Sequence, residues 1–455
     1  MKSMRNAEQA VEYMKELQPS LNAVVTFAED LQPSAQTGKL AGIPVVLKDN
    51  INTKGLRTTA SSRILDNYVP VYDAMVTEKL KNAGAVITAK ASMDELGMGG
   101  TNKNACTGPV HNPWDLNRIS GGSSGGCAVL VASGAVPLAV GSDTGDSVRK
   151  PAAYCGVVGV KPTYGRISRF GMIPYASSLD HVGYFTQNIE DAALALEVLA
   201  GRDDRDMTTS FLPVPDYSAL LNRDLKGKKI GIFKTVLDAV QDPAIRDAVA
   251  ELAEKLKEAG AEVKEVEMSE ELMNLIAPVY KTIANAEATA NHSNLDGIRY
   301  GMREDGSSVE EVMVNSRTKG FSSYVRARFV IGSYSLFDEN QDRLFRKAQK
   351  IRRLIVNAYA EMMKDLDVVL APAAPTVAPF IETASNVRFG EDRFEEEHMQ
   401  LANFSGYPSL TMPLGWEDGL PFGICLTAKP FEEQVLFDTA AGLEDLIKFE
   451  RRALA

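Results

Sequence analysis

The sequence predicts an α/β protein with a large mixed central β-sheet that is flanked on both faces by helices. The main observation is that short β-type runs alternate with helical patterns in both halves of the chain. This alternation is typical of layered α/β folds with a largely parallel or mixed sheet. Composition agrees, because 45% of the 455 residues are hydrophobic and 24% are charged, as in ordinary soluble globular proteins.

The first predicted elements lie within the N-terminal 90 residues. Apolar residues recur on one face of a helix over residues 5–18, and Pro19 is expected to end it. Residues 42–48 (GIPVVLK) and 84–90 (GAVITAK) are β-type runs, and residues 74–82 between them carry a helical pattern. The succession predicts a strand, a helix and a strand.

The same succession returns later, with a strand over 229–233, a helix over 243–259 and a strand over 261–266. Residues 366–370 (LDVVL) and 409–413 (SLTMP) predict further short strands. The polar stretch 201–216 is expected to be a long surface connection. Length alone would allow two or three average domains as well as one large α/β unit.

Charge and cysteine content exclude several classes of protein. A formal net charge of -11 excludes a protein whose whole surface binds nucleic acid. The basic run 347–353 (KAQKIRR) is a candidate for a local nucleic-acid-binding patch, and the alternative is that it forms the solvated face of a helix. The four cysteines are scattered without a CxxC pair, which predicts neither a disulfide framework nor a zinc site. The N-terminus lacks the apolar core of a signal peptide, and no apolar run approaches the roughly 20 residues of a membrane span. The expected compartment is the cytoplasm.

Residues 120–163 carry the strongest chemical signal, because two clusters of small residues flank a run that predicts a helix followed by a strand. Glycine lets successive backbone N–H groups point at a ligand, and such arrays bind phosphates or developing oxyanions. A Walker phosphate loop is excluded, since no lysine follows the glycines of GGSSGG. A flexible linker is also excluded, since apolar β-type sequence follows each cluster. Serine nucleophile chemistry remains.

A serine hydroxyl needs a neighbouring base before it can attack an amide. The chain has four histidines but no G-x-S-x-G elbow. A lysine can serve as the base when desolvation leaves its amine neutral. Lys48, at the end of the apolar run GIPVVL, is placed for this role. The alternative is that it is only the solvated end of a strand.

The segments GGSSGG and GSDTGDSVRKPAAYCGVVGVKPTYGRISRFG, together with GIPVVLKDN, resemble the amidase signature family from about residue 40 to residue 430. The resemblance implies the amidase-signature fold as one domain over 1–455, with the catalytic signature in 1–200 and a substrate-facing half in 217–455. It also implies a relay in which Lys48, a serine held by a cis peptide (Ser123) and a nucleophile (Ser147) cooperate. The backbone N–H groups implied for the oxyanion hole are those of Thr144, Gly145, Asp146 and Ser147.

Within that family, the segments SMDELGMGG and KAQKIRRLI are similar to those of the A subunit in aspartyl/glutamyl-tRNA amidotransferases. This similarity implies a glutaminase that releases ammonia from glutamine and passes it to a B subunit, with a small C subunit bridging the two. The partner would use ATP and Mg²⁺ and make most contacts with tRNA, whereas this chain would hold no cofactor or metal and contact no membrane. Arg328 falls where the glutamine α-carboxylate is bound, and a guanidinium offers that group two parallel donors. The residue for the α-amino group is expected among Glu395, Glu396 and Glu397, and we select Glu396.

Several residues depart from the family pattern. Asp146 stands where the oxyanion loop usually has a second glycine, and Lys150 stands where glutamine is common, so the two could form a compensating pair. The segment HVGYFTQ lacks the usual proline and arginine, Cys127 replaces a common small residue as a packing group, and Ser124 is expected to be structural. Three interpretations follow: a tRNA-linked glutaminase, which we favour, a stand-alone amidase acting on another small amide, or a catalytically impaired paralogue that acts as a partner scaffold.

Overall fold

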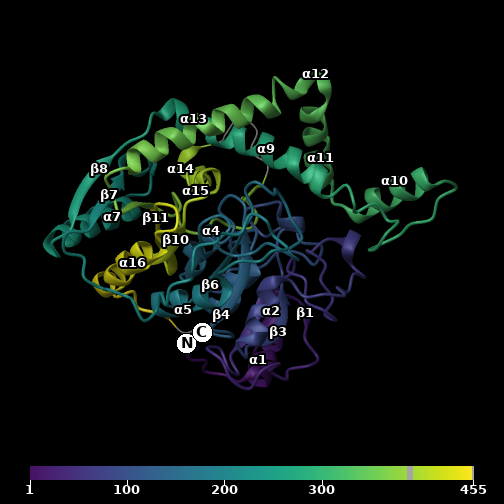
Figure 1. Ribbon diagram of the computed structural model, residues 1–455, viewed down its shortest axis with the longest axis horizontal. Coiled ribbons are helices and arrows are strands. Elements are labelled where there is room, and N and C mark those ends of the chain that lie inside the picture. The colour runs from purple at the N-terminus through teal and green to yellow at the C-terminus, as the bar shows by residue number, and fades with distance from the viewer. Residues whose placement is uncertain (387–392, 453–455) are drawn as a thin grey trace.

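The computed structural model describes residues 1–386 and 393–452, and eleven strands in this part of the chain form one sheet (Figure 1). The strand order is β1-β3-β2-β4-β6-β5-β10-β11-β9-β7-β8. The bounds are β1 Val24–Phe27, β2 Pro44–Lys48, β3 Val86–Ala91, β4 Leu138–Asp143, β5 Val158–Lys161, β6 His181–Thr186, β7 Lys229–Phe233, β8 Glu262–Val266, β9 Val368–Pro372, β10 Ser409–Glu417 and β11 Leu420–Ala428.

The sheet is mixed, as predicted. Strand β2 pairs in parallel with β3 and β4, and β7 pairs in parallel with β8 and β9, whereas the strands between these groups are antiparallel. Strands β5 and β10 bond to each other at the centre, so strands from both ends of the chain belong to one continuous sheet. The assignment of 1–200 and 217–455 to different roles stays a prediction.

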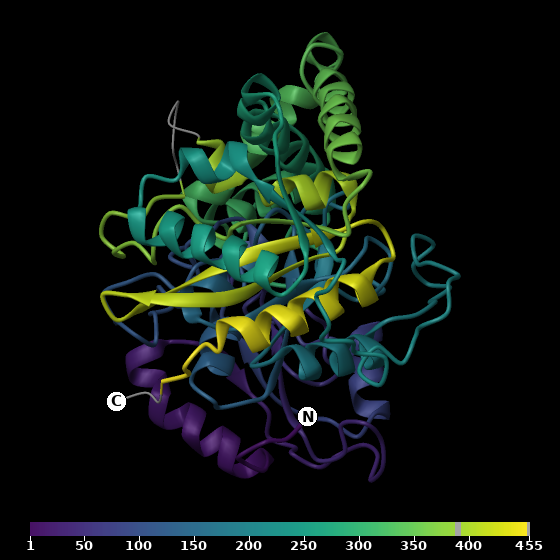
Figure 2. The ribbon, with the colours of Figure 1, turned by 90° about the vertical axis from the view of Figure 1, so that its left-hand side faces the viewer.

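Helices cover both faces of the sheet, which confirms the predicted layers (Figure 2). Strand β2 shows how the two cores form, because successive side chains of a strand point to opposite faces. Val45 and Leu47 enter one hydrophobic cluster, and Val46 enters the other. The helices of the Val46 face are α1 Ala7–Leu21, α3 Gly125–Ala132 and α4 Arg149–Cys155, and those of the opposite face are α2 Met75–Asn82, α5 Ile189–Leu199, α7 Pro243–Glu258 and α16 Glu433–Ile447.

A third group of helices, from the C-terminal half, forms a further layer beside the sheet, with α10 projecting as an arm (Figure 1). All of these helices except α10 and α12 contribute to one hydrophobic cluster, which also contains Tyr175 and the residues Met93 and Leu96 that follow β3. The group lies over the loops that carry the candidate site. Its members are α6 Lys234–Ala239, α8 Glu270–Asn274, α9 Ile276–Asn291, α10 Val309–Gly320, α11 Ser323–Leu336, α12 Asp338–Gln341, α13 Phe345–Met363, α14 Phe394–Glu397 and α15 Gln400–Ser405.

Most predicted elements are present with shifted ends, and one boundary is wrong. Helix α1 continues through Pro19 to Leu21. Proline removes one N–H donor and disfavours helix before it, but the helix ends two residues later, where left-handed Asn22 donates its N–H to Gln18 O. The strand expected over 366–370 begins at Val368, and the one expected over 409–413 extends to Glu417 because β11 pairs along its whole length.

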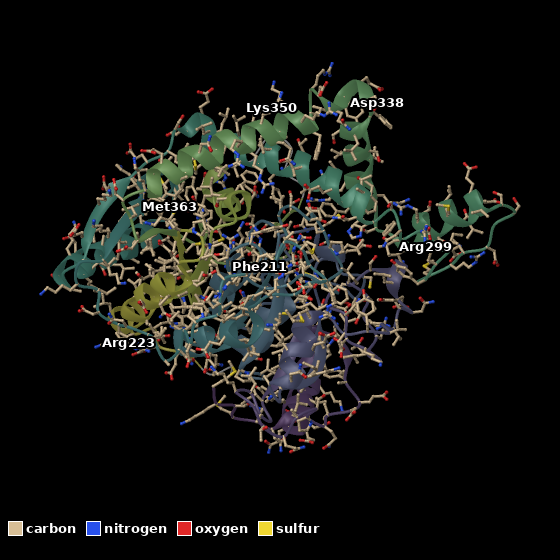
Figure 3. All side chains as sticks on the ribbon, in the orientation of Figure 1. Phe211, Arg223, Arg299, Asp338, Lys350 and Met363 are labelled. Carbon is tan, nitrogen blue, oxygen red and sulfur yellow. The ribbon has the colours of Figure 1, made fainter. Side chains whose placement is uncertain are left out.

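The basic run 347–353 lies on α13, and the prediction of a solvated helix face holds for part of it. Lys347, Lys350 and Arg353 are exposed, and Figure 3 shows Lys350 at the outer side of that helix. Arg352 instead donates to the carbonyl of Phe404 at 2.9 Å. In the described part of the chain, no helix combines the length and apolarity needed to cross a bilayer.

Candidate active site

Lys48 is the last residue of strand β2, where its side chain points to the same face as that of Val46, and it is fully buried. Its Nζ lies 2.8 Å from Ser123 Oγ, and it donates to Ser142 Oγ at 3.0 Å and to Ser142 O at 3.2 Å. Burial disfavours the charged amine and lowers the pKa of Lys48 to about 8. The lysine is therefore a buried amine in contact with a serine hydroxyl, and not the solvated end of a strand.

Ser123 lies immediately before α3, and the peptide bond between Gly122 and Ser123 is cis. Gly122 is required there, because a Cβ at this position would lie 2.0 Å from Asp94 Oδ2. Ser124, the next residue, holds the segment that contains Ser142 and Ser147. Its N–H donates to Ser147 O at 3.1 Å, and its Oγ donates to Ser142 O at 3.0 Å. These contacts bring the Ser123 and Ser147 segments together and give Ser124 a structural role.

The loop between β4 and α4, residues 143–149, is fixed by a buried ion pair. Asp143 accepts from Arg149 Nη2 at 3.0 Å and from Arg149 Nε at 3.1 Å, and both side chains are fully buried. Burial alone would raise the pKa of the Asp143 carboxyl, but the guanidinium holds it well below its usual range. Arg149 also donates to Gly145 O at 2.8 Å, and Asn403 of α15 donates to Asp143 Oδ1 at 2.9 Å. The backbone around Ser147 is therefore rigidly held.

Two further buried carboxyls lie beside the Ser123 and Ser147 segments. Thr144 Oγ1 donates to Asp180 at 2.7 Å, and Asp94 accepts from Asn102 N at 2.9 Å while its own N–H donates to Ser123 O. Burial raises the pKa of both carboxyls to about 6, against the hydrogen bonds that they accept. These two carboxyls orient the Ser123 and Ser147 segments. Within the described residues, neither carboxyl forms a hydrogen bond with the hydroxyl of Ser123 or Ser147.

The expected pair between Asp146 and Lys150 is present. Lys150 Nζ lies 2.6 Å from Asp146 Oδ2, and it also donates to Glu396 O at 2.8 Å. Burial would lower the pKa of Lys150, but the Asp146 carboxylate raises it well above its usual value. On the other side of the loop, Tyr280 of α9 packs on Gly145, where an added Cβ would come within 3.0 Å of its ring.

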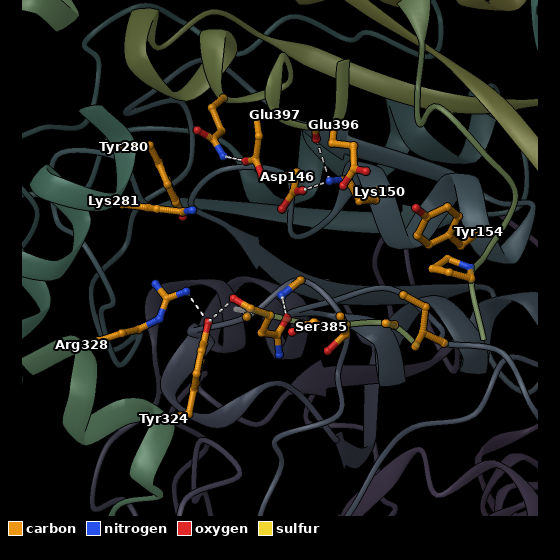
Figure 4. A pocket seen from close by; sticks show the side chains of 18 of the residues that line it. Asp146, Lys150, Tyr154, Tyr280, Lys281, Tyr324, Arg328, Ser385, Glu396 and Glu397 are labelled. Atoms are coloured by element: carbon orange, nitrogen blue, oxygen red, sulfur yellow. Dashed lines mark hydrogen bonds and ion pairs between the residues drawn. The ribbon is translucent and has the colours of Figure 1, made fainter. Parts of the chain in front are cut away.

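A cavity of about 130 Å³ opens beside this loop (Figure 4). Asp146 and Lys150 line one wall together with Glu396 and Glu397, and Arg328 lines the facing wall. Arg328 donates to Tyr175 Oη at 2.8 Å, to Asn285 Oδ1 at 3.3 Å and also to Tyr324 Oη. It is therefore held at the cavity and is not a solvated helix-surface arginine.

The cavity does not include every predicted site residue. Lys48, Ser123 and Ser147 are absent from its lining; Ser147 is 4% exposed and Ser123 1% exposed. The Tyr175 wall nevertheless lies near Ser123, because a Cβ on Gly97 would be 3.5 Å from Tyr175 Cβ and 3.9 Å from Ser123 Oγ.

The three glutamates that were candidates for the amino group differ in their surroundings. Glu396 lines the cavity but pairs with Arg393 at 2.6 Å, and Glu397 accepts from Gln400. Burial raises the pKa of Glu397. Glu395 does not line the cavity. The choice of Glu396 stays a prediction, and Glu397 is an equally placed carboxylate.

Sequence reasoning missed several residues that position the site. Asp143 and Arg149 flank the segment TGDSV, so acidic and basic residues six apart could have suggested a clamped loop. Ser142, whose Oγ accepts a hydrogen bond from Lys48 Nζ, directly precedes Asp143 in the sequence. Asn403 and the tyrosines around Arg328 had no signal, because they come from distant parts of the sequence.

The remaining departures have simple structural settings. Cys127 is fully buried on α3 and contacts Val140 O at 3.6 Å, as expected for a packing group. HVGYFT forms β6, where His181 packs edge-on against Tyr164. Among residues 1–386 and 393–452, no cluster of His, Cys, Asp or Glu is arranged to hold a metal ion.

Comparison with known proteins gives matches along nearly the whole chain. The family described as Amidase matches residues 5–437. The A subunit of the glutamyl-tRNA(Gln) amidotransferase from Fusobacterium nucleatum is 44% identical over 412 residues, which cover 90% of this chain and 84% of that protein.

Two solved structures are also similar. The A subunit of the glutamyl-tRNA(Gln) amidotransferase from Thermotoga maritima is 34% identical with a TM-score of 0.83, covering 99% of this chain and 94% of that one. A peptide amidase from Stenotrophomonas maltophilia is 28% identical with a TM-score of 0.84, covering 99% and 95%.

Proposed function

The chain belongs to the amidase family, and from that premise we propose that it hydrolyses the side-chain amide of glutamine through Ser147, Ser123 and Lys48. The observation that carries the proposal is the contact of 2.8 Å between the buried Lys48 Nζ and Ser123 Oγ. With a pKa of about 8, about one tenth of this amine is neutral at pH 7. A neutral amine at that distance can accept the proton of Ser123.

In the first half of the reaction, Ser147 Oγ attacks the amide carbonyl. Its proton passes to Ser123 Oγ as the Ser123 proton passes to Lys48 Nζ. The carbonyl oxygen becomes an oxyanion, which backbone N–H groups among Thr144 to Ser147 would stabilise; loss of one such donor costs roughly 10²–10³ in rate.

In the second half, the carbon–nitrogen bond breaks. Ser123 gives a proton to the departing nitrogen and recovers one from Lys48, so ammonia leaves and an ester to Ser147 remains. Water then attacks that ester, losing a proton to the same relay. Protonation of Ser147 Oγ releases the acid and regenerates the enzyme.

The cavity supports an α-amino acid amide as the substrate. Arg328 on one wall suits an α-carboxylate, and the facing wall carries Glu396 and Glu397, which suit an α-amino group. The name shared by the Fusobacterium and Thermotoga relatives further supports glutamine as the substrate and the B and C chains of an amidotransferase as partners. Under this proposal the B chain binds ATP and Mg²⁺ and makes most of the contacts with tRNA. The complex acts in the cytoplasm.

A stand-alone amidase acting on another small amide is the second candidate. The observation in its favour is the similarity to a peptide amidase over 99% of this chain. Ammonia release from glutamine, measured with and without the two partner chains, separates the candidates, because the second one predicts turnover of another amide that the partners do not change.

The first test is covalent labelling with a fluorophosphonate, read as intact mass. A single adduct on the native chain, absent from Ser147→Ala and strongly slowed in Lys48→Ala, is the expected result. Ser124→Ala is the matched control, because it removes a neighbouring hydroxyl but keeps the Ser124 N–H that donates to Ser147 O, and it is expected to label. A chain that stays unlabelled in every form, including Asp146→Gly, would contradict the proposal and favour a scaffold.

A further inference from the structure

The oxyanion loop carries a negative charge that a hydrolase of this kind has to neutralise. Asp146 immediately precedes Ser147, so its carboxylate lies next to the backbone that would bind the oxyanion. A fixed negative charge there opposes the developing negative charge of the transition state. The loop is mostly buried, so solvent screens this repulsion weakly.

Lys150 is positioned to neutralise that charge. Lys150 N donates to Asp146 O at 2.9 Å, which closes one helical turn and places the two side chains on one face. The side chains are 12% and 15% exposed and their charged atoms lie 2.6 Å apart. The ammonium is further anchored by Glu396 O on α14 (Figure 4).

No substrate-binding role is needed to explain these contacts. Arg328, the cation suited to a substrate carboxylate, lies on the facing wall of the cavity (Figure 4). Lys150 is held on its own wall by two oxygen partners, one from its own loop and one from α14. Both partners hold the ammonium beside Asp146.

Resting on the proposed function, we propose that Lys150 is a positioning residue that neutralises Asp146, so that the loop of residues 144–147 can bind an oxyanion. The two residues then act as one unit. The cost of losing the lysine depends entirely on whether the aspartate is present.

The test is a cycle of four proteins: the native chain, Lys150→Gln, Asp146→Gly and the double variant. Each is assayed for the rate of fluorophosphonate labelling and for kcat and KM of glutamine hydrolysis with the partner chains. Lys150→Gln is expected to lower kcat and the labelling rate about 10²-fold, the scale of one lost oxyanion donor. With glycine at position 146, the same Lys150→Gln change is expected to alter neither kcat nor the labelling rate, so the double variant is expected to match Asp146→Gly.

Two further variants separate charge from folding. Lys150→Arg keeps the cation and is expected to recover most of the rate. Lys257→Gln removes a lysine that also lies 2.6 Å from a carboxylate, but on the exposed surface, and is expected to change nothing. Thermal melting of every variant shows that the compared proteins are folded.

The outcomes distinguish this inference from the proposed function. If Lys150→Gln slows the reaction equally with Asp146 or Gly at position 146, or if it raises KM alone, Lys150 does not act through Asp146 and the inference is overturned. If the native chain is inert and Asp146→Gly becomes reactive, Lys150 fails to neutralise the loop. If none of the four proteins reacts, the proposed function itself fails and the inference falls with it.

Discussion

Lys48 combines the proposed role of a base with an environment that is unfavourable for charge. Its burial lowers its pKa from the usual value of a lysine to about 8, because the ammonium loses its hydration. In the proposed relay, only the neutral amine can accept the proton of Ser123. Protonation of Lys48 is therefore expected to stop the reaction as the pH falls, so that activity rises with pH through the pKa of Lys48.

We expect kcat/KM for amide hydrolysis to fall about tenfold for each pH unit below the pKa of the base, with an apparent pKa near 8. Rates measured from pH 6 to 10 test this. Lys48→Arg is expected to be inactive throughout, because a guanidinium stays protonated. An acid limb near 6 would instead point to Asp94 or Asp180, whose carboxyls have a pKa of about 6.

The apolar run before Lys48 made it a candidate base, and the glycine clusters indicated serine chemistry within residues 120–163, but only the family resemblance selected Ser123 and Ser147. Both signals are local. Arg328 and the glutamates depended on resemblance, since a helical arginine or an acidic triplet looks the same in a solvated helix. Tyr175, which helps to hold Arg328, carried no sequence signal, because the two residues are 153 positions apart.

At the scale of elements, the loop from β4 to α4 depends on a single buried ion pair. Asp143 and Arg149 are fully enclosed, and Arg149 also reaches Asn403 Oδ1 at 2.7 Å. Removing one member of such a pair leaves an uncompensated charge in the interior. The loop is therefore sensitive to single substitutions and tolerant of matched ones.

We expect Arg149→Met to lower the free energy of unfolding by about 3–5 kcal/mol, measured by urea unfolding at pH 7. Asp143→Asn combined with Arg149→Met is expected to recover part of this loss. The folded-state pKa of Asp143 is depressed, so its stabilisation is complete above the ordinary carboxyl pKa of about 4 and is lost as the pH falls below it. An Arg149→Met variant as stable as the native chain would contradict this account.

Strands β2 and β3 lie just after a glycine and open with an apolar run, so they could be predicted from the sequence. Strand β1 has four residues and no such signal. Strand β6 begins with a histidine and β11 contains Gly423, so their strand character depends on partners on either side. The predicted end of α1 was wrong because Pro19 lies in the last turn of the helix, where a proline removes few hydrogen bonds.

At the scale of the whole molecule, one site is assembled from both ends of the chain. The residues of the proposed relay lie before residue 150, whereas Arg328, Glu396 and Asn403 come from the C-terminal half. Strands β5 and β10 join these parts through antiparallel pairing in the middle of the sheet. Neither part can complete the site alone.

We expect a chain cut after Phe211, which is 83% exposed, to keep its activity when residues 1–211 and 212–455 are produced together. The fragment 1–211 alone should not react with a fluorophosphonate, because it lacks Asn403 and strand β10, which pairs with one edge of β5. Labelling rates and urea unfolding of the fragment, the pair and the intact chain provide the measurement. A lone N-terminal fragment that labels as fast as the intact chain would show that the second half is dispensable for the relay.

The single turn that separates Asp146 from Lys150 restricts the order in which such a pair can arise. A loop with glycine at 146 tolerates a lysine at 150, since an added cation near the oxyanion does not oppose the reaction. The aspartate arriving first would leave its charge uncompensated and the lineage would pass through a slow enzyme. If Lys150 neutralises Asp146 as we propose, the accessible mutational path acquires the lysine before the aspartate, and once both are present, reverting the lysine alone is the harmful step.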